Sequence, residues 1–232
     1  MRGFVNFLIR KIKKDPDYKL DEDISLIALL EILFRRFFAL LNGVFRQLLL
    51  LRKPGFWFIS RGVSLLASSK LEVNGVVTIG KNVTLDAMSK NGIRLGSNIT
   101  IPDNCFFRCT GVISDIGEGL IVGDNTGFGH NNFINAQGGV VIGCDVIIGP
   151  YVNILAENHN FGDSTIPIRK QGVTRKGIII ESDVWIGAGV SILDGVKIGK
   201  GTVIGAGSIV TKSIPEYSIA LGNPCKVIKS RK

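Results

Sequence analysis

Aliphatic residues recur at every sixth position through long stretches of residues 70–232. The clearest block contains Ile180, Ile186, Ile192, Ile198, Ile204 and Val210. Earlier blocks with the same spacing contain Val122, Phe128 and Ile134, then Ile142, Ile148 and Ile154, and further back Leu95 with Ile101 and Ile79 with Leu85. A spacing of six fits neither the period of a helix nor the alternation of a β-meander.

Short strands separated by tight turns explain this period, because each strand then contributes one inward aliphatic side chain. Three such strands complete one triangular coil, and stacking the coils pairs each strand in parallel with the next. The pattern therefore predicts a mainly β protein, with a parallel β-helix of hexapeptide repeats over residues 69–216. Fold alone does not imply chemistry, so function has to come from the irregular segments.

Residues 1–68 have a different pattern, rich in Leu, Ile and Phe. Residues 24–52 predict a helix, and its polar residues Glu31, Arg35, Asn42 and Arg46 fall on one narrow stripe. The longest stretch without charge, Phe37–Phe45, is far shorter than the roughly 18 residues that a spanning helix needs.

Residues 3–14 carry four apolar side chains beside four basic ones, which are Phe4, Phe7, Leu8 and Ile12 and then Arg10, Lys11, Lys13 and Lys14. Basic amphipathic helices with aromatic residues are typical of the membrane interface. The pattern predicts an N-terminal amphipathic segment, 1–68, at a membrane surface. The alternative is a helical cap over the open end of the β-helix, where strand edges need cover.

The charge distribution agrees with a membrane contact. The formal net charge is +9, and residues 1–61 hold twelve Lys and Arg against six Asp and Glu. A basic balance is compatible with nucleic acid, an anionic membrane or a phosphorylated ligand. The aromatic residues stand among Leu and Ile and form no base-stacking platform, so we expect no nucleic-acid partner.

Four cysteines, Cys105, Cys109, Cys144 and Cys225, lack zinc-knuckle spacing. They are interpreted as reduced thiols, and no metal is expected. The N-terminus lacks the uninterrupted apolar stretch of a secretory signal. We therefore expect a cytoplasmic protein, peripheral at the inner face of the cytoplasmic membrane.

The hexads stop after Ile154 and resume at residues 178–180, and one of the chain's two histidines stands at this break. Insertions at solenoid corners often build a binding face, so the break predicts a pocket beneath a lid loop, 160–177. His159 faces that pocket in this interpretation and is a candidate general base. The alternative is a surface histidine at the beginning of a loop.

Two carboxylates flank this histidine. Glu157 and Asp163 could orient the ring or be solvated. The segment 127–137 gathers His130, Asn131, Asn132 and Asn135, and about half of this cluster is expected to be ordinary corner residues. His130 is either a second site residue or a corner. The basic lid residues Arg169, Lys170, Arg175 and Lys176 could meet phosphates or only water.

The segment "GIIIESDVWIGAGVSILDGVKIGKGTVIGAGSIVTKSIPEYSIALGNPCKVIK" closely resembles the C-terminal half of hexapeptide-repeat acyltransferases. This family includes maltose and galactoside acetyltransferases and the sugar O-acetyltransferases of bacterial surface polysaccharide synthesis. The resemblance covers residues 75–232 and implies a left-handed coil. It also implies a homotrimer with acetyl-CoA as co-substrate in the groove between coils of two subunits. The stretch "ENHNFGD" lacks the His-Pro of the maltose type and is closer to the polysaccharide enzymes.

The resemblance also implies roles for individual residues. His159 is the catalytic base, Asn131 or Asn132 contacts the acceptor, and Trp185 lines the channel. Glu157 joins the acceptor-binding set beside them. The expected contacts to acetyl-CoA are Ala188 and Ala206 through their backbone, then Thr211, Lys212, Lys226 and Lys229, the last two in the C-terminal tail 217–232.

These features predict an acetyl-CoA-dependent O-acetyltransferase acting by direct transfer on a sugar of a bacterial surface polysaccharide or its lipid-linked precursor. The alternatives are an N-acetyltransferase on a nucleotide-linked amino sugar and a serine acetyltransferase. The γ-class carbonic anhydrase of the same fold needs three histidine ligands, and the chain has two. A non-catalytic scaffold is a further alternative.

Overall fold

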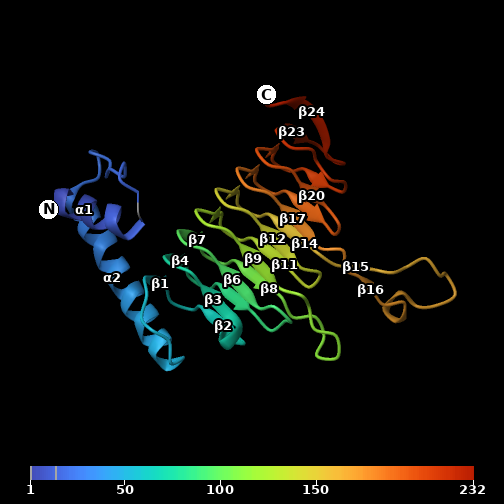
Figure 1. Ribbon diagram of the computed structural model, residues 1–232, viewed down its shortest axis with the longest axis horizontal. Coiled ribbons are helices and arrows are strands. Elements are labelled where there is room, and N and C mark those ends of the chain that lie inside the picture. The colour runs from blue at the N-terminus through green and yellow to red at the C-terminus, as the bar shows by residue number, and fades with distance from the viewer. Residues whose placement is uncertain (1, 14) are drawn as a thin grey trace.

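The computed structural model describes residues 2–13 and 15–232, so Lys14 of the predicted basic set lies outside the described residues. Three sheets form the sides of a prism, all parallel except for the last strand of the first sheet, and the chain visits each side once per coil (Figure 1). Two helices stand at the N-terminal end of the prism. The protein is mainly β, and its main body is a left-handed parallel β-helix, as the hexads and the resemblance predicted.

The strands are short, and most have two or three residues. The first sheet has the order β1 (Trp57–Ile59), β4 (Val77–Ile79), β7 (Ile99–Ile101), β10 (Gly127–Phe128), β13 (Ile147–Ile148), β18 (Trp185–Ile186), β21 (Val203–Ile204), β23 (Ser218–Leu221) and β24 (Lys226–Ser230). The second contains β2 (Ser64–Leu66), β5 (Thr84–Asp86), β8 (Phe106–Arg108), β11 (Phe133–Asn135), β14 (Asn153–Leu155), β19 (Ser191–Leu193) and β22 (Ile209–Val210). The third contains β3 (Leu71–Val73), β6 (Ile93–Leu95), β9 (Leu120–Val122), β12 (Val140–Ile142), β17 (Ile178–Ile180) and β20 (Lys197–Ile198).

The hexad residues fill the interior of the prism. Every aliphatic position that the spacing singled out is buried, and together they form one continuous core. In one register row, Ile134 pairs with Phe107 and Ile154, and Ile192 with Ile154 and Val210. Burial of this column supplies the main stabilisation, at roughly 25 cal/mol per Å² of apolar area. Several corners use asparagine with a positive φ, such as Asn82, Asn98 and Asn125, because asparagine tolerates this backbone region better than most residues.

The N-terminal helices cover the first edge of the β-helix. These are α1 (Arg2–Lys13) and α2 (Leu26–Leu49), and Ser25 caps α2 by accepting from the backbone N–H of Ala28. The second helix packs directly on β1 (Figure 1). Gly43 permits this approach, since a Cβ there would meet the carbonyl oxygen of Trp57 at 1.8 Å.

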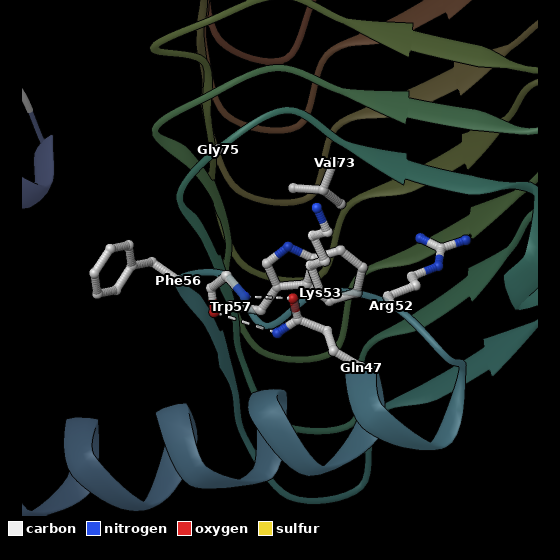
Figure 2. Close-up of a pocket in the computed structure, with 8 residues that line it drawn as sticks. Gln47, Arg52, Lys53, Phe56, Trp57, Val73 and Gly75 are labelled. Carbon is white, nitrogen blue, oxygen red and sulfur yellow. Dashed lines mark hydrogen bonds between the residues drawn. The ribbon is translucent and has the colours of Figure 1, made fainter.

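Polar groups also hold α2 to the first coil. Asn42 Nδ2 donates to the carbonyl of Ile59 at 3.0 Å. The buried Gln47 amide accepts from Gly55 N at 2.7 Å and donates to Gly55 O at 3.3 Å, beside the Trp57 indole (Figure 2). The structure thus supports the capping interpretation for the inner side of α2. No helix in the described residues is long and apolar enough to cross a membrane.

The β-helix begins earlier than the sequence analysis placed it. Residues 1–68 were assigned to the helical segment, but β1 and β2 already pair in parallel with β4 and β5. The second α-helix, α2, ends at Leu49, within the predicted span 24–52, and only the short 3-10 helices η1 (Ser68–Lys70) and η2 (Ile168–Lys170) follow it in the described residues. At the other end, β23 extends the first sheet and pairs antiparallel with β24, so the tail 217–232 covers the last coil.

Candidate active site

The insertion after β14 forms a two-stranded antiparallel arm that projects from the β-helix (Figure 1). Its strands are β15 (Asn158–His159) and β16 (Val173–Thr174). Two polar side chains hold the arm together by hydrogen bonds. Asn160 Oδ1 accepts from Thr174 Oγ1 at 2.6 Å. Gln171 Nε2 donates to the carbonyls of Asp163 and Ile166, both at 2.7 Å. The predicted lid is therefore an ordered arm rather than an irregular loop.

His159 lines a cavity of about 530 Å³ where the arm leaves the coil. This volume is within the range of small-molecule sites. The polar side chains around it are Arg108, Asp115, Asn135, Gln137, Glu157, Arg169 and Arg175. The prediction that the break in the hexads makes a pocket faced by this histidine is confirmed. An exposed imidazole beside a polar cavity is placed to accept a proton from a bound hydroxyl or amine.

Glu157 lines the same cavity, but its carboxylate is bound to Arg175 and not to the histidine. Arg175 Nε donates to Glu157 Oε2 at 2.7 Å, and its Nη1 lies 3.0 Å from Asp115 Oδ1. Burial lowers the pKa of Arg175, but the hydrogen bond and charge of Glu157, with Asp115, outweigh it and raise that pKa. The suggested role of Glu157 in orienting the ring is therefore not seen.

Asp163 also departs from its suggested role beside the histidine. Its Oδ1 accepts from the backbone N and the Oγ1 of Thr165 at 2.8 and 2.6 Å. The side-chain hydrogen bond from Thr165 is the main reason why the pKa of Asp163 is lowered. Asp163 therefore stabilises the outer turn of the arm.

Arg108 and Gln137 are cavity residues that the sequence analysis did not single out. Arg108 on β8 and Asn135 on β11 are register partners, so their side chains lie on the same face. Gln137 Nε2 donates to the carbonyl of Thr110 at 2.6 Å. Arg108 forms no ion pair or side-chain hydrogen bond within residues 2–13 and 15–232, which leaves a free cation in the cavity.

Two further expected acceptor residues, Asn131 and Asn132, lie at another corner, directly before β11 of the second sheet. Asn131 has the left-handed backbone of a corner residue, with φ 60°. Asn132 is only 2% exposed, and its Oδ1 accepts from Val152 N at 2.7 Å, so its burial contradicts a contact with the acceptor. Trp185 is 54% exposed on β18 in the first sheet and does not line the cavity of His159 within one chain.

The expected coenzyme residues Ala188 and Ala206 occupy this second corner in consecutive coils, where Gly207 N donates to Ala188 O at 2.8 Å. Both alanines are exposed. Neither alanine donates its own backbone N–H to an acceptor in the described part of the chain. Thr211 and Lys212 follow β22, and Lys226 and Lys229 lie on β24, all with exposed side chains.

Two cysteines near this region are buried thiols. Burial raises the pKa of Cys109 to about 12, and burial likewise raises the pKa of Cys105. Within the residues that the structure describes, no three His, Cys, Asp or Glu side chains are grouped as metal ligands.

Comparison with known proteins shows the family to which the chain belongs. Residues 177–212 match the family model "Bacterial transferase hexapeptide (six repeats)". The galactoside O-acetyltransferase of Lactococcus lactis is 36% identical over 145 residues, which covers 56% of this chain and 70% of that protein. The probable acetyltransferase Rv3034c of Mycobacterium tuberculosis is 34% identical over 181 residues, or 75% of this chain. This chain spans 58% of that relative's length.

A solved structure is similar at the level of the fold. The N-acyltransferase AntD from Bacillus cereus, as a variant in complex with dTDP and coenzyme A, gives a TM-score of 0.52 at 27% identity, covering 66% of this chain and 84% of AntD. The class defined by fold and sequence is therefore the left-handed β-helix transferase. The chain belongs to the family of hexapeptide-repeat acetyltransferases.

Proposed function

We propose that this protein is an acetyl-CoA-dependent O-acetyltransferase that acylates a sugar hydroxyl, with His159 as general base. The observation that carries the proposal is the position of His159. This histidine lines a polar cavity at the break in the hexads between Ile154 and residues 178–180. The galactoside O-acetyltransferase at 36% identity supports an oxygen acceptor. The coenzyme A in the AntD structure supports the donor.

The proposed reaction is a direct transfer. His159 takes the proton of the acceptor hydroxyl, and its oxygen attacks the thioester carbonyl carbon. Backbone N–H groups stabilise the oxyanion, and the carbon–sulfur bond then breaks. The CoA thiolate leaves and recovers the proton from the imidazolium, so no net charge is left on the protein. The raised pKa values of Cys105 and Cys109 argue against a cysteine acyl-enzyme.

The expected residues fall into two groups, which favours a site built between two copies of the chain. His159 and Glu157 follow β14, whereas Asn131, Ala188 and Ala206 lie at the corner that precedes the strands of the same sheet. The unused N–H groups of the two alanines suit the amide carbonyls of a pantetheine arm, and Thr211, Lys212, Lys226 and Lys229 suit the rest of CoA. The resemblance to hexapeptide-repeat acyltransferases supports a homotrimer as the assembly, and the proposal puts Trp185 near a neighbour's cavity in it.

The proposed acceptor is a sugar of a bacterial surface polysaccharide or its lipid-linked precursor. It would be met in the cytoplasm, at the inner face of the membrane. The resemblance of "ENHNFGD" to the polysaccharide enzymes supports this acceptor class. The apolar outer side of α2 supports the peripheral location.

An acetyl-transfer assay with radiolabelled acetyl-CoA tests the proposal. The acceptors are envelope glycan and lipid-linked precursors from the source cell. We expect base-labile label with wild type and a loss of about 10²–10⁴-fold with His159→Ala. Asn158→Ala is the matched control, because successive strand residues point to opposite faces and Asn158 does not line the cavity.

A transfer rate unaffected by His159→Ala would refute the assigned base. CoA binding without transfer to any glycan would favour the N-acyltransferase alternative, for which AntD is the precedent. A dTDP-linked amino sugar is the probe in that case, and the product would be stable to mild base. Absence of both transfer and CoA binding would indicate a scaffold.

A further inference from the structure

The outer side of α2 is an apolar stripe along the whole helix. The exposed members recur at three- and four-residue spacing and are Ile27, Leu30, Phe34, Phe37, Phe38, Leu41, Phe45, Leu48 and Leu49. The inner side holds Leu29, Gly43 and Gln47, which are buried. On α1, Phe4 and Phe7 are likewise exposed. Capping of the β-helix therefore uses one side of α2 and leaves the other uncovered within the described residues.

An apolar surface of this extent marks an interaction site, because monomeric soluble proteins rarely expose large contiguous apolar patches. Several of its members are aromatic, and Phe34 and Phe38 pack edge-to-face with centroids 4.6 Å apart. The helix as a whole is not apolar enough to cross a bilayer, and it carries Glu31, Arg35 and Arg46 beside the stripe. It is, however, suited to lie in the plane of one.

The basic residues next to this apolar surface come from α1. Arg10, Lys11 and Lys13 stand in its last turn, whereas Lys53, which follows α2, points toward Val73 on the coil side of that helix (Figure 2). Five acidic residues lie in the connection between the helices, residues 15–23, and a sixth, Glu31, is paired with Arg35 on α2. Basic residues near an anionic bilayer strengthen binding, because the negative surface potential of the bilayer attracts them.

We propose that the outer side of α2, with Phe4 and Phe7 of α1, binds the surface of an anionic lipid bilayer. Aromatic and aliphatic side chains enter the interface, and the basic residues in the last turn of α1 meet lipid phosphates.

This contact orients the β-helix with its axis along the membrane normal. The inner side of α2 covers β1, the edge strand, so the stripe faces away from the coils (Figure 1). In the second sheet β14 stands four strands beyond β2. With strands about 4.8 Å apart, His159 lies about 19 Å above the first coil. This step rests on the proposed function. The sugar that is acetylated is then not the one attached to the lipid phosphate but one several units further along the glycan.

Vesicle co-sedimentation of the full chain tests the membrane contact without any need for activity. The probes are vesicles of phosphatidylcholine alone and of phosphatidylcholine mixed with phosphatidylglycerol. We expect binding to the anionic vesicles, and a fall of the partition coefficient on the order of 100-fold for the variant Phe34→Gln/Leu41→Gln/Phe45→Gln. The control variant Ile113→Gln/Phe161→Gln/Ile168→Gln replaces three exposed apolar residues outside both helices and should bind like wild type.

Equal binding by the two triple variants would overturn the assignment of the surface. Equal binding to neutral and anionic vesicles would overturn its anionic specificity. Absence of binding, with a change of oligomeric mass in the α2 variant alone, would assign the stripe to a second copy of the chain. None of these outcomes depends on acetyl transfer, so failure here leaves the proposed function standing.

Discussion

Arg175 and Glu157, separated by 18 residues, close the base of the arm through a hydrogen bond of 2.7 Å. Their side chains are only 16% and 14% exposed. Removal of the cation leaves the Glu157 carboxylate without its partner in a poorly solvated site, whereas the exposed Asp115 remains hydrated. We predict that Arg175→Met lowers the free energy of unfolding by about 1–3 kcal/mol and loosens the arm.

Limited proteolysis checks this prediction, because Arg169 and Lys170 are exposed on the arm. Trypsin should cleave after these residues faster in Arg175→Met than in wild type. Arg61→Met, which removes an exposed arginine outside the cavity, is the control. Equal cleavage rates in all three proteins would show that the ion pair does not hold the arm.

The repeat was predictable because a solenoid repeats its constraint in every coil. Each inward position requires the same type of residue. The aliphatic residues at six-residue spacing from Ile180 to Val210 therefore identify the core without any knowledge of contacts. The first coil was predictable by the same rule, since Ile59, Leu65, Leu71 and Val77 also stand six apart. The surrounding phenylalanines instead suggested a continuation of the helical segment.

The cavity was only partly predictable, because its walls come from separate interruptions of the repeat. The break after Ile154 predicted that His159 faces a pocket. The ion pair of Glu157 with Arg175 could not be predicted, because it depends on where the second end of the arm rejoins the coil. Arg108 meets Asn135 only through a strand register that spans the irregular loop after Cys109. Spacing along the chain carries no information about such a register.

Arg108 should affect acceptor binding more than donor binding. It is a free cation in the cavity of His159, and a hydrogen bond from a charged donor contributes about 1.5–3 kcal/mol. We predict that Arg108→Gln raises KM for the glycan acceptor about tenfold or more and leaves KM for acetyl-CoA unchanged. Arg94→Gln, on the third sheet, is the control. An increase confined to KM for acetyl-CoA would instead assign Arg108 to the donor.

Gly43 should be irreplaceable in the contact between α2 and β1. A methyl group there would meet the Trp57 carbonyl oxygen at 1.8 Å, so the helix would have to move away from the coil. We predict that Gly43→Ala lowers the free energy of unfolding by about 1–3 kcal/mol, despite alanine's better helix propensity. Gly3→Ala, where a Cβ has nothing within 4 Å, should be neutral or stabilising by about 0.5–1 kcal/mol. Thermal unfolding of both variants measures the difference.

The buried cysteines should be unreactive in the folded protein. Burial, with a smaller contribution from Asp86, raises the pKa of Cys109 from 9.0 to about 12. Its thiolate fraction at pH 9 is then on the order of one in a thousand. Alkylation counted by mass spectrometry should modify the partly exposed Cys144 first. Rapid modification of Cys109 in the native protein would contradict its burial.

The same shift makes stability fall at alkaline pH. The unfolded thiol ionises at about pH 9 and the folded one at about pH 12, so the unfolded state holds fewer protons between these values. The stabilisation is complete below pH 9 and is lost as pH rises toward 12. We predict that Cys109→Ala flattens this alkaline decline in urea unfolding curves, and an unchanged slope would exclude the thiol as its cause.

The two tryptophans of the chain offer a test of the upright orientation on a membrane. Trp57 lies directly beneath α2, and Trp185 stands on β18, five strands beyond β1 in the same sheet. At about 4.8 Å per strand, this separates the two indoles by about 24 Å along the axis. Energy transfer to a dansyl-labelled lipid should therefore be efficient in Trp185→Phe, which retains Trp57, and weak in Trp57→Phe. Equal transfer from both positions, at equal vesicle binding, would mean that the β-helix lies on its side, with His159 near the lipid surface.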